Sequence, residues 1–178
     1  ILMNCYNGEE YIEESVQSVI NQTYQNWELI FWDNQSKDNS GRIFKQFTDK
    51  RLKYYYAKKH TSLYEARNLA IEKSKGDFIA FLDDDDVWLE SKLLKQVEVL
   101  SRTPEDVGLV YCWFDIIDGH NKVGSRKPEL EGNLFDELLV GQPLGNASTL
   151  LVKKQVINRA GGFDVNLPRG NDGDFIRR

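Results

Sequence analysis

Two kinds of segment follow one another along the first hundred residues. Short apolar runs typical of buried strands occur at residues 1–5, 27–32, 52–57 and 78–82. Between these runs apolar side chains recur at helical spacing, as in Ile12, Val16 and Val19. Parallel neighbours in a sheet need crossover connections, which are normally helices. The pattern therefore predicts an α/β fold with a mostly parallel central sheet and helices on both faces.

The second half of the chain predicts a mixed arrangement. The expected elements are a strand at 109–117, a hairpin-type turn at 118–121 leading to Val123, a polar loop at 124–133, a short helix at 134–140 and a strand at 149–152. Gly161 and Gly162 should end a further short helix. No polar segment is long enough to separate two cores, so we expect a single domain over residues 1–178.

Charge and composition narrow the class of protein. The 178 residues are 40% hydrophobic and carry a formal net charge of −5, from 23 Lys and Arg against 28 Asp and Glu. This composition excludes a disordered or fibrous chain, and its acidity argues against nucleic acid as a partner. No apolar run reaches the roughly 20 residues of a membrane-spanning helix, and no signal peptide is recognisable. We therefore expect a compact soluble domain.

The two cysteines, Cys5 and Cys112, lie in apolar, strand-like segments. That context predicts buried thiols in a reducing compartment, and it argues against a disulfide framework or a zinc site. The chain starts at Ile1 within an expected strand and ends at Arg178 within an expected helix. We therefore expect a fragment of a longer protein.

The strongest chemical signal is a run of four aspartates, Asp83 to Asp86, directly after the apolar run at 78–82. At about 4 Å each pair of like charges costs on the order of 1 kcal/mol in water and more near a protein surface. Carboxylate oxygens select hard divalent ions, which relieve this repulsion. A metal site is therefore the favoured interpretation. The alternative is that the aspartates cap a helix beginning near Val87.

Further polar groups follow other expected strands. Asp33 follows the run at 27–32, but turn and helix-cap chemistry up to Ser40 explains it equally well. Tyr6 follows the first strand, where its ring could stack on a flat base or sugar. Its neighbour Asn7 is better explained as a turn residue.

Other candidates are weaker on sequence alone. Arg67, on an expected helix, could face the phosphates of a ligand, although an exposed arginine that pairs locally is the commoner case. Asp172 lies in a glycine-flanked turn at a helix start, where capping is the alternative. A basic stretch with Tyr54 to Tyr56 is expected to solvate an edge strand, and His60 and His120 receive no role.

Taken together, the residues resemble a known family in ordered blocks over nearly the whole chain. The blocks are Asn4-Cys5-Tyr6-Asn7-Gly8, Asp33-Asn34-Gln35-Ser36, Ala66-Arg67-Asn68, residues 76–86, Gly161-Gly162-Phe163-Asp164 and Asn171-Asp172. They resemble the inverting glycosyltransferases of family 2, which have the GT-A, or nucleotide-diphospho-sugar transferase, fold. Two positions depart from the usual pattern, because Asn34 and Asn171 stand where that family commonly has acids.

The resemblance implies a donor site in a nucleotide-binding half of about residues 1–107. Asn4, Tyr6 and Asp33 would contact the donor, the last two at the nucleotide base, and Arg67 would lie near the nucleotide. UDP is the nucleotide that the resemblance favours. The acceptor-side half, about residues 108–178, would be truncated at its carboxyl end.

The resemblance also implies a metal and a general base. Asp83 to Asp85 would form the D-x-D element of the family, with Asp85 as the principal ligand of Mn²⁺ or Mg²⁺. Asp83 and Asp84 would lie toward the sugar and ribose side, Asp83 as a second metal ligand and Asp84 as a substrate contact. Asp172 would be the general base for an acceptor hydroxyl.

The implied biological setting is bacterial cell-surface polysaccharide synthesis. The acceptor would be a saccharide or a lipid-linked saccharide, which would place the protein in the cytoplasm or at the inner face of the membrane. Two other functions remain open: a sugar-nucleotide-binding module without catalysis, and a structural domain stabilised by calcium. A sugar-phosphate nucleotidyltransferase is disfavoured, because the segment after the first strand has a single glycine, Gly8.

Overall fold

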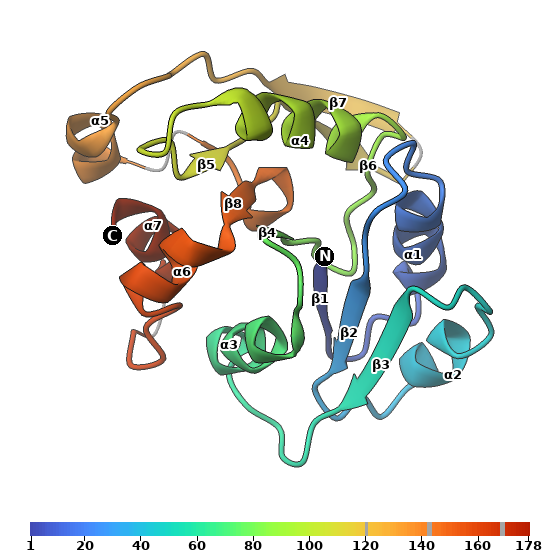
Figure 1. Cartoon of the computed structure of the whole chain (residues 1–178). Coiled ribbons are helices and arrows are strands. Elements are labelled where there is room, and N and C mark those ends of the chain that lie inside the picture. The colour runs from blue at the N-terminus through green and yellow to red at the C-terminus, as the bar shows by residue number, and fades with distance from the viewer. Residues whose placement is uncertain (120, 142–143, 168–169) are drawn as a thin grey trace.

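The computed structural model describes residues 1–119, 121–141, 144–167 and 170–178 (Figure 1). Its strands are β1 (Leu2–Cys5), β2 (Leu29–Asp33), β3 (Leu52–Tyr56), β4 (Phe78–Ala80), β5 (Leu109–Val110), β6 (Phe114–Asp118), β7 (Asn121–Arg126) and β8 (Leu151–Lys153). Its helices are α1 (Ile12–Ile20), α2 (Ser40–Phe44), α3 (Leu63–Lys73), α4 (Lys92–Arg102), α5 (Phe135–Val140), α6 (Lys154–Ala160) and α7 (Asn171–Arg177), with a 3₁₀ turn at Ala147–Thr149. Strands and helices alternate as far as α4, which confirms the α/β prediction.

The central sheet is parallel in its first half and mixed in its second. Strands β1, β2 and β3 pair in parallel, and β3 forms the edge. Leu2 forms a parallel bridge with Phe81 just beyond β4. Strand β8 pairs antiparallel with both β4 and β5. The strand order is therefore β3-β2-β1-β4-β8-β5, and the late strand β8 ties the second half of the chain into the sheet of the first half.

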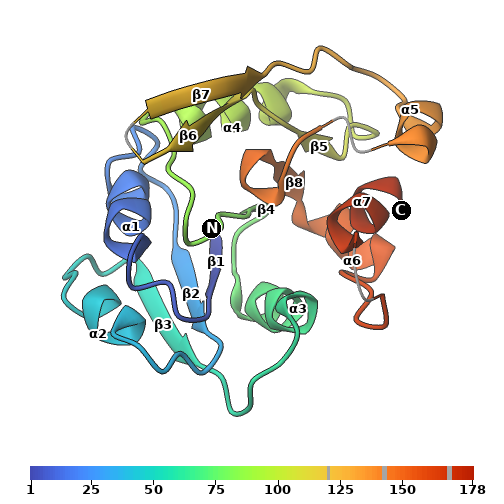
Figure 2. The same ribbon diagram turned by 180° about the vertical axis from the view of Figure 1, so that it is seen from behind.

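Helices cover both faces of this sheet. Successive strand residues point to opposite faces, so neighbours such as Leu2 and Met3 belong to different cores. One buried core joins Met3 and Phe31 to residues of α1, α2 and α4. The other joins Leu2 and Ile30 to residues of α3, α6 and α7. Figures 1 and 2 show α1 and α2 on one side of the parallel strands and α3 on the other.

The prediction of one strand at 109–117 is wrong. The segment divides into β5 and β6, and Cys112 lies between them rather than within a strand. Tyr111 donates a hydrogen bond to the carbonyl of Leu130, and Trp113 donates one to the carbonyl of Pro128. These contacts with a distant loop divert the chain, and β6 pairs with β7 in a separate hairpin.

Two other boundaries also differ from the predictions. The loop expected at 124–133 starts later, because β7 continues to Arg126. The expected turn at 118–121 contains His120, which lies outside the described residues. The short helix at 134–140 is confirmed as α5, and α6 ends at Gly161, which adopts the left-handed conformation (φ 78°) that glycine tolerates.

Candidate active site

The four consecutive aspartates form a tight turn at the carboxyl end of β4. The backbone N–H of Asp86 donates to the carbonyl of Asp83 over 3.1 Å, so Asp84 and Asp85 occupy the central turn positions. Helix α4 begins only at Lys92, after the N-cap Ser91. The helix expected to begin near Val87 is therefore misplaced, and the aspartates do not cap it. We call residues 83–86 the acidic turn.

Side chains from two other segments hold the acidic turn from behind. Ser15 of α1 lies with its hydroxyl 2.8 Å from the carbonyl oxygens of both Asp84 and Asp86. Ser148 accepts a hydrogen bond of 3.0 Å from the backbone N–H of Asp83. Asn146 donates one of 2.9 Å to the carboxylate of Asp86. Most of these contacts are to backbone atoms of the turn. Some of its carboxylates are therefore available to a ligand.

Of the two carboxylates at the centre of the turn, that of Asp84 is more buried than that of Asp85. It lies against the buried Cys5 thiol and beneath Gly8, where any side chain would collide with the Asp84 carboxylate. Burial, and then the charge of Asp85, raise the pKa of Asp84 above its usual value, although a hydrogen bond from Cys5 offsets part of this. Burial and the neighbouring Asp84 charge likewise raise the pKa of Cys5 to about 12. Cys5 is therefore a packed thiol and not a nucleophile, and Asp84 faces the loop after β1.

Asp85 is exposed, and the described residues give it no hydrogen bond or ion pair. Within the described parts of the chain no three Asp, Glu, His or Cys side chains gather to hold a metal by themselves. Mg²⁺ commonly takes only one or two carboxylates and completes its shell with substrate phosphates and water. Burial raises the pKa of Asp86 above its usual value, hydrogen bonds from Ser148 and Asn146 offset part of this, and the charges of Asp83 and Asp85 add to it. An exposed carboxylate in a turn of four aspartates is suited to a cation that binds together with a diphosphate.

Arg67 of α3 joins this turn to the far end of the chain. Its Nη2 donates to Asp83 Oδ1 over 2.7 Å, and its Nη1 donates to Asp172 Oδ1. The side chain is only 2% exposed, and its guanidinium carbon lies 5.4 Å from the ring centre of Phe163. The common case of an exposed, locally paired arginine does not hold here. Its partners are 16 and 105 residues away, so no local sequence signal could reveal them.

Helix α7 presents Asp172 to Arg67. Gly170 enters this helix in the left-handed conformation (φ 74°), and Asp172 lies in its first turn. Phe175, three residues later and so on the same face, is buried and stacks on Phe163 with ring centres 4.6 Å apart. On the sequence alone, a functional role for Asp172 is favoured over helix capping only if its side chain faces the acidic turn. The structure brings it to the same guanidinium as Asp83.

Asn68 fixes a second contact between the same two regions. Its amide nitrogen donates to the carbonyl of Phe163 over 2.8 Å, and its amide oxygen accepts from the N–H of Phe163 over 2.9 Å. Gly162 (φ 74°) allows this approach, because a Cβ there would lie 2.6 Å from the Asn68 amide oxygen. The block at 66–68 therefore binds both the 161–164 block and Asp172.

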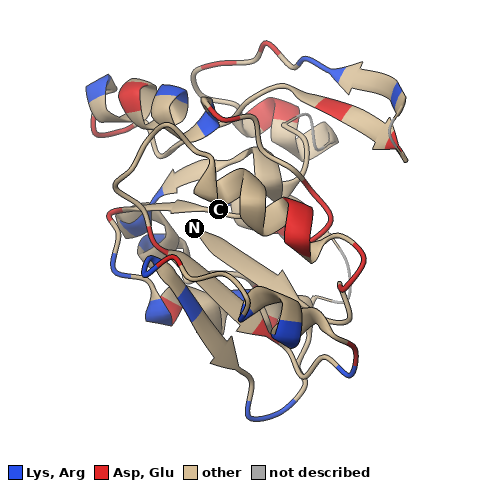
Figure 3. Ribbon diagram, turned by 90° about the vertical axis from the view of Figure 1, so that its right-hand side faces the viewer, with Lys and Arg blue, Asp and Glu red and all other residues tan. Residues whose placement is uncertain are grey.

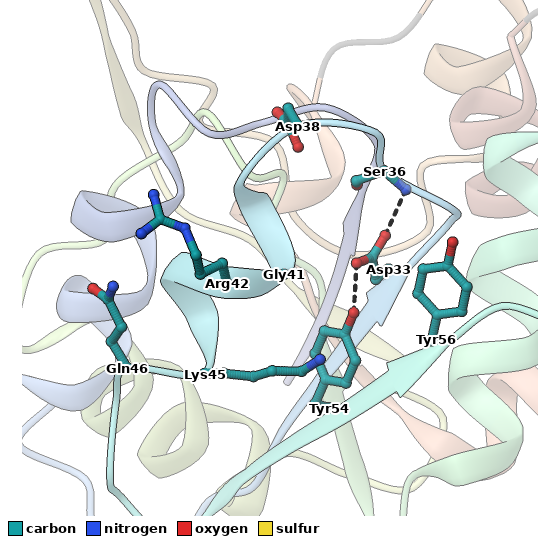
Figure 4. A pocket seen from close by; sticks show the side chains of 9 residues that line it. All are labelled: Asp33, Ser36, Asp38, Gly41, Arg42, Lys45, Gln46, Tyr54 and Tyr56. Atoms are coloured by element: carbon teal, nitrogen blue, oxygen red, sulfur yellow. Dashed lines mark hydrogen bonds between the residues drawn. The ribbon is translucent and has the colours of Figure 1, made fainter.

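Asp33, at the end of β2, is buried and fully bonded. Its carboxylate accepts from the N–H of Ser36 over 2.7 Å and from the hydroxyl of Tyr54 over 2.6 Å (Figure 4). The bond from Ser36 is the one expected of a residue that starts a turn. Burial, and after it the hydrogen bond to Asp33, raise the pKa of Tyr54 above its usual value. Asp33 also borders an open cavity of about 400 Å³ whose other lining residues are Ser36, Asp38, Gly41, Arg42, Lys45, Gln46, Tyr54 and Tyr56.

Aromatic rings lie beside Asp33 on the same edge of the sheet. Tyr6 is exposed, and its ring centre lies 4.3 Å from that of His60. The His60 ring is fixed by Nδ1, which lies 2.8 Å from the carbonyl oxygen of Asn34. Sequence reasoning assigned His60 no role, because only the fold brings it to Tyr6. The two rings are tilted by 53° to each other, so one ring at a time can present its face to a flat base.

Three asparagines also lie at this edge. The Asn34 amide donates to the carbonyl of Thr61 and accepts from the Thr61 N–H. The asparagine at this position, where the family commonly has an acid, thus holds the loop before α3. Asn4 lies opposite Trp32 in the register of β1 and β2. Its amide nitrogen is buried and unpartnered within the described structure. Asn7 adopts φ 60° and accepts a hydrogen bond from the N–H of Lys37, as expected of a turn residue.

Charged positions of both signs are interspersed over the outer elements in the view of Figure 3. The basic stretch includes β3, which forms the sheet edge as expected. None of the helices in the described parts of the chain is long and apolar enough to cross a membrane.

Two solved structures with a similar fold contain a nucleotide or a nucleotide sugar. S. aureus TarS 1–349, solved in complex with UDP, superposes with a TM-score of 0.77 over 98% of this chain and 52% of that chain, at 19% identity. A mannosyltransferase from Pyrobaculum calidifontis, in complex with GDP-Man and Mn²⁺, gives a TM-score of 0.74 over 98% of this chain and 49% of that chain, at 20% identity. These likenesses confirm the GT-A fold.

Sequence relatives give the family. An Escherichia coli protein, UDP-Glc:alpha-D-GlcNAc-diphosphoundecaprenol beta-1,3-glucosyltransferase WfgD, is 37% identical over 70% of this chain and 48% of its own length. An uncharacterized glycosyltransferase of Rickettsia typhi is 31% identical over 98% of this chain and 56% of its own length. The chain thus spans about half the length of these relatives. The profile of the family described as Glycosyl transferase family 2 matches residues 1–159. The chain belongs to glycosyl transferase family 2.

Proposed function

We propose that the protein moves a sugar from a nucleoside-diphosphate donor to an acceptor hydroxyl, with the help of a divalent cation and with inversion at the anomeric carbon. The observation that carries this proposal is the meeting of the acidic turn and Asp172 on one buried guanidinium. This meeting supports a single site at the carboxyl edge of the sheet, in which Asp85 would bind the cation and Asp172 would accept the proton. Ligands bind beyond this edge in open α/β sheets.

The donor binds across the ends of β1, β2 and β4. The exposed Tyr6 ring stacks on the base with His60 at its edge. Asn4 and Asp33 complete that side, Asp33 by exchanging its bond to Tyr54 for one to the base. A UDP-sugar is our preferred donor, because the name of the E. coli relative contains UDP-Glc and S. aureus TarS was solved with UDP. Asp84, which lies under the loop after β1, holds that loop and contacts the ribose side.

Asp85 would be the principal metal ligand, and Asp83 would contribute its Oδ2, for which the described residues show no hydrogen bond. Mn²⁺ or Mg²⁺ bound there would neutralise the charge of the departing diphosphate. Calcium binding for structural purposes is the less favoured alternative, since Ca²⁺ takes six to eight oxygen ligands and the described residues offer few.

Asp172 acts on the acceptor. Its carboxylate takes the proton of the acceptor hydroxyl as that oxygen forms a bond to the anomeric carbon from the face opposite the diphosphate. The bond between the anomeric carbon and the diphosphate oxygen breaks, and its electron pair leaves on the diphosphate. One displacement inverts the configuration.

A lipid-linked saccharide is the acceptor that we propose, because the name of the E. coli relative contains diphosphoundecaprenol. Such an acceptor would place the reaction at the cytoplasmic face of a membrane, in the synthesis of a cell-surface polysaccharide.

A transfer assay with the full-length protein tests this function. Nucleotide sugars are offered with a lipid-diphosphate saccharide, and the anomeric configuration of the product is determined by NMR. We expect an inverted product, and we expect Asp172→Asn to lower kcat by about 10²- to 10⁴-fold while donor binding persists. Asp174→Asn, in the same helical turn, is the matched control. A retained configuration contradicts the mechanism, and donor binding without transfer to any acceptor favours the binding module.

A further inference from the structure

We propose that Arg67 is a positioning residue, which orients the Asp172 carboxylate beside the acidic turn and does not bind the phosphates of the donor. This inference rests on the proposed function, in which Asp172 accepts the acceptor proton. It reverses the expectation that Arg67 meets the nucleotide. Three observations support it: the burial of the guanidinium, its two partners, and the way in which α7 is held.

The first observation is that the guanidinium is enclosed. Arg67 is 2% exposed, and its guanidinium carbon lies over the rings of Phe81 and Phe163, 5.9 and 5.4 Å from their centres. Both terminal nitrogens already donate to carboxylates. A side chain in this position has almost no free surface to offer to a diphosphate.

The second observation is that the two partners are more exposed than Arg67 itself. The side chains of Asp83 and Asp172 are 34% and 33% exposed, so the arginine anchors them from the protein side. Each carboxylate is held through Oδ1. For Oδ2 of Asp172 the described residues show no other partner, which leaves one oxygen of the base for the acceptor hydroxyl. The planar, multi-donor guanidinium suits this task, because it fixes the direction of two carboxylates at once.

The third observation is how the described residues hold α7: Arg177 and Arg178 bond its carboxyl end to the carbonyls of Leu138, Ala160 and Gly162, whereas Asp172, at the other end, is bonded to Arg67. The helix has seven residues and begins after Gly170. Its best-packed side chain, Phe175, stacks on Phe163, the ring that also lies beneath Arg67. Arg67 therefore links the proton acceptor on α7 to the metal-binding turn after β4, two elements that are remote in sequence. A small displacement of such a group has a large effect on rate.

The test compares Arg67→Met and Arg67→Lys in the full-length protein by steady-state kinetics and by calorimetric titration of UDP with Mn²⁺. We expect Arg67→Met to lower kcat by about 100-fold while the Kd for UDP changes less than about twofold. Arg67→Lys should recover part of kcat, because it keeps the charge but not the two-pronged geometry. Combining Arg67→Met with Asp172→Asn should cost no more than Asp172→Asn alone, because both changes disable the same group.

Asn68→Ala is the matched structural control, since it loosens the neighbouring contact to Phe163 without touching either carboxylate. We expect it to lower the thermal midpoint and to lower kcat far less than Arg67→Met does, because Arg67 still holds both carboxylates. If Arg67→Met instead weakens UDP binding about tenfold and leaves kcat unchanged, Arg67 is a nucleotide ligand and the inference is wrong. Equal losses of kcat in Arg67→Met and Asn68→Ala would also overturn it. Failure of the wild-type protein to transfer any sugar overturns the proposed function, and the role of Arg67 falls with it.

Discussion

Asp33 and Asp85 both follow a strand of the central sheet, yet their surroundings differ completely. Asp33 is 2% exposed, and its two oxygens are occupied by Ser36 and Tyr54. Asp85 is exposed and has no partner among the described residues, while its neighbours Asp84 and Asp86 are partly buried. The same sequence feature, an acid after an apolar strand, thus yields one structural carboxylate and one available carboxylate. Availability to a cation depends on the tertiary partners of each acid.

The largest expected difference between the two sites is in stability. Asp33→Ala should lower the free energy of unfolding by about 2–4 kcal/mol, because it removes a buried carboxylate and leaves the half-buried donors of Ser36 and Tyr54 without an acceptor. Asp85→Ala should leave the urea midpoint unchanged or slightly raised, since it removes charge from a crowded turn. Urea denaturation followed by circular dichroism measures both. Equal losses in the two variants would show that Asp85 has structural partners after all.

A smaller effect is expected at Asn34, which follows Asp33. Asn34→Asp should lower the free energy of unfolding by about 2 kcal/mol, because a carboxylate cannot donate to the carbonyl of Thr61 and is charged at a site only 5% exposed. The control is Asn133→Asp, at an exposed position. The same denaturation experiment applies, and a neutral Asn34→Asp would mean that the loop before α3 is held by other contacts.

The smallest expected effect concerns pH and the acidic turn. Burial, and then the charge of Asp85, raise the pKa of Asp84 above the value of 3.8 of the unfolded chain. The stability that Asp84 contributes is therefore full below about pH 4 and is lost as pH rises through its folded pKa. Asp85→Asn removes one source of the shift, so the variant should lose less stability than wild type over this interval, by less than about 1 kcal/mol.

Urea midpoints measured from pH 3 to pH 7 would reveal this difference. Asp77→Asn, at the opposite end of β4, is the control for removing one acid. Parallel curves for the wild-type protein and Asp85→Asn would contradict the coupling between Asp84 and Asp85.

Local patterns predicted much of the fold. The apolar runs at residues 1–5 and 27–32 predicted buried strands, and both runs lie in the parallel half of the sheet with side chains in each of the two cores. The pattern failed where long-range contacts decide. Trp88 is held by Ser18 and Ser148, so α4 begins later than expected. Tyr111 and Trp113 bond to a distant loop and interrupt the run at 109–117.

The sequence predicted which residues form the candidate site but not how their side chains contact one another. The acidic turn was recognised because four consecutive acids need no tertiary information. The burial of Arg67 and the contact between His60 and Tyr6 depend on pairings across 16 to 105 residues and across loops, which spacing does not encode. The roles of Asp85 and Asp172 are proposals, which variants at these two positions test.

The most direct test of the central claim is calorimetric titration of UDP into the protein with and without Mn²⁺. We predict binding that requires Mn²⁺, that is lost in Asp85→Ala, and that persists in Asp77→Ala, where the same residue type is removed from the other end of the same strand. Binding of UDP that is equally strong without Mn²⁺, or that survives in Asp85→Ala, would contradict the assignment of the acidic turn as the metal-binding part of a sugar-nucleotide site.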